Sequence, residues 1–87
     1  MKIKQGFILR EVSGNFIVVA VGEGTKTFNG MIQLNDTGAF LWKLLESGAT
    51  EEQMIEQMVK EYSVEKQIAS EDVKEFIESL KEANLLV

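Results

Sequence analysis

The stretch GMIQLNDTGAFLWKLL, from Gly30 to Leu45, contains the change of hydrophobic period that decides the fold. Before Asn35, Met31 to Leu34 form a short apolar run that predicts a strand. After Asn35, apolar residues return at helical spacing, and the short polar side chains at positions 35–37 suit a helix cap. We therefore expect a very short strand that passes directly into a helix, which ends near Gly48.

The spacing of the apolar residues also predicts which face of this helix is buried. That face is expected to comprise Thr37, Phe40, Leu41, Leu44 and Leu45. Trp42 falls at the edge of the face, so we expect it to be a partly buried packing residue.

Two apolar runs precede the opening stretch. FILREV, residues 7–12, and FIVVAV, residues 16–21, are separated by the turn residues Ser13, Gly14 and Asn15. This pattern predicts a β-hairpin. The following segment, TKTFNGMIQL, contains the turn signal Asn29-Gly30, which could divide it into two short extended pieces.

Two further helices are predicted after Gly48. Thr50 begins the first, and Gln53 three residues later completes a capping-box pattern. Its buried face is expected to comprise Met54, Ile55, Met58, Val59 and Tyr62, opposite a solvated face of glutamates at positions 51, 52, 56 and 61. The last helix is expected from about Glu65 to Ala83, with a buried face of Ala69, Val73, Phe76, Ile77, Leu80 and Ala83.

Three strands followed by three helices predict a single α+β domain over residues 1–87, with the helices against one face of an antiparallel sheet. A sheet of three strands has two edges, and soluble proteins usually protect such edges with lysine, proline or a bulge. Met31 to Leu34 has no such residue. This strand is therefore a candidate for pairing with another chain.

The composition excludes several classes of site. The chain has no cysteine and no histidine, which removes thiolate chemistry, the commonest general base and the commonest metal ligand. We expect no catalytic residue, no cofactor and no metal. The net charge of −5 disfavours nucleic acid as a partner. No apolar run is long enough for a signal peptide or a membrane span, so we expect a cytoplasmic protein with no membrane partner.

Three segments give the chain a resemblance to a known family. LNDTGAFLW (34–42), LLESGATEEQMIEQMVKEY (44–62) and EDVKEFIESLKEANLL (71–86) resemble the PqqD family, the leader-peptide-binding recognition elements of ribosomally synthesised, post-translationally modified peptide pathways. Two features depart from the pattern. The stretch GEGTKTFNG between the second and third strands is long, and Asn84 stands where a glycine is common.

The resemblance implies a winged-helix-like fold and a noncatalytic adaptor. Such an adaptor binds the leader of a precursor peptide as an added strand and presents it to a modifying enzyme, such as a radical enzyme or a protease. It also implies a peptide-binding site at the third strand and the third helix. The residues expected there are Met31, Ile32, Gln33, Leu34, Asp72, Phe76, Ser79 and Leu80.

Several alternatives stay open at this point. Phe76 and Leu80 at helical spacing are first of all core residues, and Asp72 near a helix start is as well explained by the helix dipole as by a ligand. The sequence does not decide which flank of the third helix faces the sheet edge, nor which amides of the third strand point outward. A winged-helix DNA-binding regulator is the alternative function, although the last helix carries more acidic than basic residues. A homodimer through the same edge is also possible.

Overall fold

The elements follow in the predicted order, with one addition, in the computed structural model, which describes residues 1–26 and 30–87. The elements are β1 (Phe7–Val12), β2 (Asn15–Ala20), a short 3₁₀ helix η1 (Gly22–Lys26), β3 (Met31–Leu34), α1 (Asp36–Glu46), α2 (Glu51–Tyr62) and α3 (Lys66–Glu82). The added element, η1, occupies part of the long stretch between β2 and β3. Thr25 stabilises it by donating a hydrogen bond from its Oγ1 to the Gly22 carbonyl at 2.7 Å. The turn expected at Asn29-Gly30 lies partly outside the described residues.

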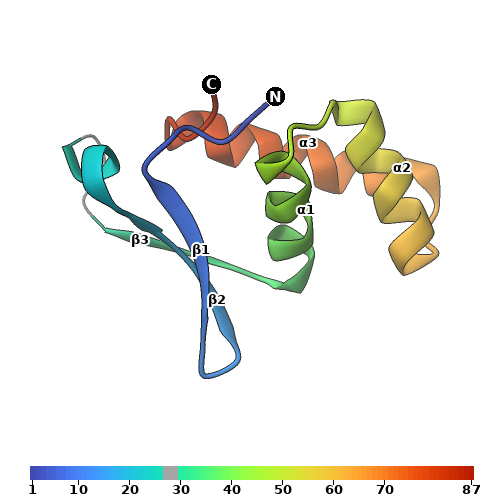
Figure 1. Cartoon of the computed structure of the whole chain (residues 1–87). Coiled ribbons are helices and arrows are strands. Elements are labelled where there is room, and N and C mark those ends of the chain that lie inside the picture. The colour runs from blue at the N-terminus through green and yellow to red at the C-terminus, as the bar shows by residue number, and fades with distance from the viewer. Residues whose placement is uncertain (27–29) are drawn as a thin grey trace.

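The sheet is antiparallel with the strand order β1-β2-β3, so β3 is an edge strand. The hairpin that joins β1 to β2 turns at Ser13 and Gly14, which have φ values of 51° and 80°. Two successive positive φ angles are those of a type I′ turn, whose twist matches that of the paired strands. In Figure 1 the three helices lie together on one side of the sheet, and the β1–β2 hairpin extends away from them.

The core lies between the sheet and the helices, and α1 is rotated relative to the prediction. Trp42 is 0% exposed, so the expectation of a partly buried residue at the edge of the face was wrong. Phe40 and Leu44, which were expected on the buried face, are only half-buried. The reason is that α1 contacts β3 on one side and both α2 and α3 on others, so its buried arc is wider than a single stripe and includes Trp42.

The other two helices bury most of the predicted residues, but Val59 is only half-buried and Tyr62 is exposed. Met54, Ile55 and Met58 of α2 are buried, but Tyr62 is 38% exposed. Tyr62 ends α2 and packs its ring edge-to-face against Phe40, with ring centroids 5.4 Å apart, at the outer margin of the core. On α3 the buried residues are Ala69, Val73, Phe76, Ile77 and Leu80, and Ala83 is half-buried.

The C-terminus is fixed against the N-terminal segment. Asn84 has a φ of 60°, the left-handed conformation that asparagine tolerates almost as well as glycine. Its side-chain carbonyl accepts a hydrogen bond from Lys4 Nζ at 2.8 Å. Leu86 forms an antiparallel bridge with Ile3, and both chain ends lie near each other in Figure 1. Among the described residues, no helix is long and apolar enough to span a bilayer.

The Asn35 cap gives a first testable prediction. Asn35 Oδ1 accepts a hydrogen bond from the Gly38 amide at 2.7 Å and so satisfies one of the unpaired donors at the start of α1. We expect Asn35→Ala to lower the free energy of unfolding by about 1 kcal/mol. Urea denaturation followed by circular dichroism measures this change. Gln57→Ala on the exposed face of α2 is the control, and equal stability of the two variants would contradict the capping role.

Candidate peptide-binding groove

The pairing register shows which backbone groups of β3 point away from the sheet. The Val21 amide donates to the Gly6 carbonyl at 2.8 Å, in line with the β1–β2 register. Because antiparallel ladders alternate, Ile17 and Val19 also direct their backbone groups toward β1. The alternate residues of β2, Phe16 and Val18, therefore form their backbone hydrogen bonds with β3.

The same alternation then applies to β3. Phe16 lies opposite Leu34 and Val18 lies opposite Ile32, so Leu34 and Ile32 are the β3 residues that bond β2. Met31 and Gln33 consequently direct their N–H and C=O groups outward, along the edge of the sheet. This resolves the question that the sequence left open, and the outward groups belong to Gln33 rather than to Ile32.

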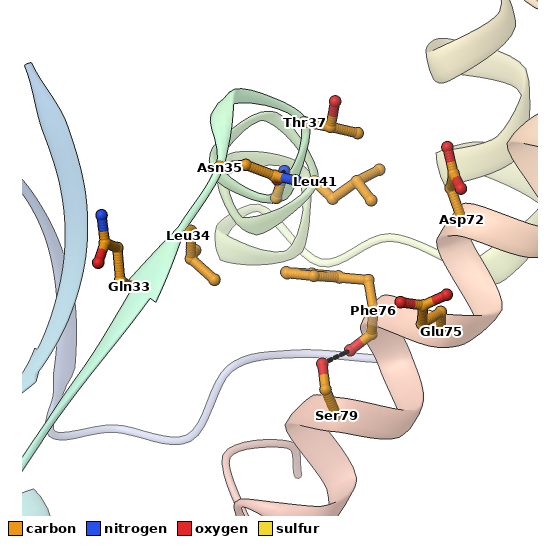
Figure 2. A pocket seen from close by; sticks show the side chains of 10 residues that line it. Gln33, Leu34, Asn35, Thr37, Leu41, Asp72, Glu75, Phe76 and Ser79 are labelled. Carbon is orange, nitrogen blue, oxygen red and sulfur yellow. Dashed lines mark hydrogen bonds between the residues drawn. The ribbon is translucent and has the colours of Figure 1, made fainter.

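A groove of about 390 Å³ lies beside this edge. It is bounded by the end of β3, the first turns of α1 and one flank of α3 (Figure 2). Its lining residues are Gln33, Leu34, Asn35, Thr37, Gly38, Leu41, Asp72, Glu75, Phe76 and Ser79. The flank of α3 that faces the sheet edge is therefore the one that carries Asp72 and Ser79.

Five of the eight predicted site residues line this groove. They are Gln33, Leu34, Asp72, Phe76 and Ser79. Met31 and Ile32 lie further along β3 and are not part of the lining, although Met31 belongs to the same free edge. Leu80 is 2% exposed and belongs to the core, which leaves it no surface for a ligand. Whether a peptide binds to these residues stays a prediction.

The floor of the groove is apolar. In Figure 2 the Phe76 ring extends from α3 toward Leu34 of β3 and Leu41 of α1. Phe76 is buried, so its core role and its place in the groove coexist. Gly38 allows α1 to pack closely against the end of β3, since a Cβ atom at this position would come within 3.1 Å of Asn35 Oδ1 and 3.3 Å of Leu34 Cβ.

The α3 wall is polar and negative. Asp72 and Glu75 are exposed carboxylates one turn apart, and neither forms an ion pair with any described residue. Ser79 donates its hydroxyl to the Phe76 carbonyl at 2.8 Å. Gln33 points its side chain away from Phe76 in Figure 2 and donates from Nε2 to Asn15 Oδ1 at 3.5 Å. Its backbone is thus the part of Gln33 that is presented to the groove.

Sequence reasoning missed half of the lining residues. The missed residues are Asn35, Thr37, Gly38, Leu41 and Glu75. Glu75 could have been found, because it lies three residues from Asp72 and therefore on the same helix flank. The α1 residues had only the signals of a helix cap and a core stripe. No group of three or more acidic residues suited to a metal ion occurs among residues 1–26 and 30–87.

Comparisons with known proteins agree on the fold. The family described as coenzyme PQQ synthesis protein D (PqqD) matches residues 8–86 of the chain. The structure entitled "TbiB1 in Complex with the TbiA(beta) Leader Peptide" is similar with a TM-score of 0.79 and 24% identity, over 99% of this chain and 94% of that one. A lasso peptide synthetase B1 complexed with the leader peptide is similar with a TM-score of 0.77 and 22% identity, over 99% and 95%. No curated protein sequence matches the chain significantly.

Proposed function

This chain belongs to the PqqD family, and from that premise we propose that it is a noncatalytic adaptor that binds the leader of a ribosomally made precursor peptide. The leader adds a strand to β3, and the adaptor presents it to a modifying enzyme, such as a radical enzyme or a protease. One observation carries the proposal: the free edge of β3 opens onto a groove of about 390 Å³ whose opposite wall is α3. The two similar structures, each of a protein in complex with a leader peptide, support it.

Strand addition fixes how the leader is oriented. Its backbone pairs with the outward groups of Met31 and Gln33, which supplies affinity without regard to sequence. Its side chains alternate between the two faces of the extended sheet. Those opposite Ile32 and Leu34 lie on the helix side, where the one opposite Leu34 enters the groove, whereas those opposite Met31 and Gln33 lie on the other side. Only alternate leader residues are therefore selected by the groove.

The chemistry of the groove indicates what those residues are. An apolar or aromatic side chain opposite Leu34 fits against Phe76 and Leu41 on the floor. A lysine, arginine or amide beyond it reaches the carboxylates of Asp72 and Glu75, which no described cation neutralises. We propose that the preferred leader segment combines an apolar anchor with a nearby basic or amide side chain.

The alternative function, DNA binding, has less support. A winged-helix regulator places its third helix in the major groove, where lysine and arginine contact phosphates. In α3, the lysines at 66, 74 and 81 are outnumbered by acidic residues at 71, 72, 75, 78 and 82, which gives 3 − 5 = −2. A helix of this charge is repelled by the DNA backbone.

The direct test is an NMR titration of the ¹⁵N-labelled protein with a synthetic peptide. This peptide comprises the leader half of the precursor that the protein recognises. We expect the largest amide shifts at Met31, Gln33, Phe76 and Ser79.

Ser79→Trp should fill the groove and weaken leader binding at least about tenfold, because the indole takes the place of the anchor side chain. Gln67→Trp, an exposed neutral residue on another face of α3, is the matched control. Shifts confined to residues 51–61, with both variants binding normally, would overturn the proposal.

A further inference from the structure

Met31 is the most exposed large apolar residue of the three strands, at 66%. Its side chain lies on the face of the sheet that turns away from the helices, because Ile32 and Leu34 pack against the core and successive side chains alternate. We call this side of the sheet the outer face. Soluble proteins usually protect an edge strand with charged residues. An exposed methionine on the edge strand β3 is therefore unexpected.

Met31 ends an aliphatic row that crosses the outer face. It lies opposite Val19 of β2, which in turn lies opposite Ile8 of β1. Residues directly opposite each other share a face, and all three lie outside the core cluster of buried residues. A strand that is added to β3 continues this row with one of its own side chains.

The other outward side chain of β3 already has a partner. Gln33 donates a hydrogen bond from its Nε2 to Asn15 Oδ1 at 3.5 Å, within the sheet. Met31 has no strong donor or acceptor in its side chain, so its exposed surface is stabilised by apolar contact alone. Of the two outward positions, Met31 is the one whose side chain gains most from an apolar neighbour on an added strand.

We propose that Met31 is a second specificity determinant for the leader and selects an apolar leader side chain on the outer face. The proposal rests on the strand addition proposed above. The outward amide and carbonyl of Met31 pair with the leader backbone, which places the side chain of the leader residue opposite Met31 on the outer face, with the Cβ atoms about 5 Å apart. An aliphatic or aromatic side chain there covers the methionine. A charged side chain is partly desolvated against it and gains no ion pair.

The register also sets the distance between the two selected leader residues. The groove anchor lies opposite Leu34 and the outer-face residue lies opposite Met31, three positions apart on β3. The two leader residues are therefore also three positions apart, whichever way the leader runs. An odd separation places them on opposite faces of the sheet. The preferred leader segment thus differs from a simple amphipathic strand, in which apolar residues recur at even spacing.

Selection from a phage-displayed library of random dodecapeptides tests which side chains are chosen. Peptides enriched by the wild-type protein should carry two apolar residues three positions apart. Met31→Lys should replace one of them by aspartate or glutamate, and Met31→Glu should replace the same one by lysine or arginine, because each variant then offers a cross-strand ion pair. The groove anchor should be retained in both selections. A reversal of the selected charge cannot result from misfolding.

The matched control is Val12→Lys. Val12 is also an exposed apolar residue of the outer face, at 51%, but it lies on β1, which β2 separates from β3. An added strand next to β3 does not reach it. The peptides enriched by Val12→Lys should therefore match those enriched by the wild-type protein.

Fluorescence anisotropy with one enriched peptide measures the size of the effect. Replacing its outer-face residue by aspartate should weaken binding to the wild-type protein about two- to fivefold and should strengthen binding to Met31→Lys. Equal weakening with both proteins, or the same enriched sequences for the wild-type protein and both Met31 variants, would overturn the proposal and leave strand addition in place. Peptides that bind Gln33→Pro as tightly as the wild-type protein would instead overturn strand addition itself, since this variant lacks an outward amide.

Discussion

Replacing Gln33 by proline is expected to weaken leader binding about 10- to 100-fold while leaving the fold intact. Proline has no amide hydrogen, and the Gln33 amide points out of the sheet toward the incoming strand. The loss leaves a leader carbonyl without a donor, which costs about 1–3 kcal/mol, and each 1.4 kcal/mol corresponds to roughly tenfold in affinity. An outward-facing proline is tolerated on an edge strand, so the free protein should remain folded.

The matched variant for this experiment is the neighbouring residue. Ile32 lies opposite Val18 and bonds it within the sheet, so Ile32→Pro removes an internal hydrogen bond instead of an external one. It should lower the thermal midpoint of unfolding, whereas Gln33→Pro should leave that midpoint nearly unchanged. Calorimetric titration with the leader, together with thermal unfolding, separates the two effects. Normal binding by Gln33→Pro would show that the leader does not pair with β3.

The second large effect is expected at Trp42. Its side chain is 0% exposed and packs among residues of all three helices in the core cluster, so Trp42→Ala leaves a large cavity. We expect a loss of about 3–5 kcal/mol in the free energy of unfolding. This is a large part of the total stability of a small domain, and a substantial unfolded population should result. Because Trp42 is the one tryptophan of the chain, unfolding must be followed by circular dichroism.

Phenylalanine at the same position is the control. Trp42 Nε1 is buried and has no hydrogen-bond partner among the described residues, so Trp42→Phe removes an unsatisfied donor as well as some volume. Its loss of stability should be well below that of Trp42→Ala. Equal losses for the two variants would contradict the cavity explanation, because a phenyl ring fills much of the space that alanine leaves empty.

Predictions from the sequence agree with the structure for local features but not for features that depend on long-range packing. The strand that becomes a helix at Asn35, the capping box of Thr50 with Gln53, and the buried stripe of α3 were all predicted, and the structure shows each of them. These features depend on residues a few positions apart. The burial of Trp42 was mispredicted, because it depends on α2 and α3 packing around α1 from distant parts of the chain.

Local patterns along the chain were enough to predict the order and type of the main elements, the family, and the candidate strand at the edge. Hydrophobic period, caps and turn residues act over a few residues, so they can be read directly. The packing of the folded chain was needed to show which flank of α3 faces β3 and that Gln33 presents the outward amide. Both depend on how β3 is paired with β2 and how α3 is rotated on the core. These follow from packing between residues far apart in the chain, where a shift of one position would exchange the inward and outward groups.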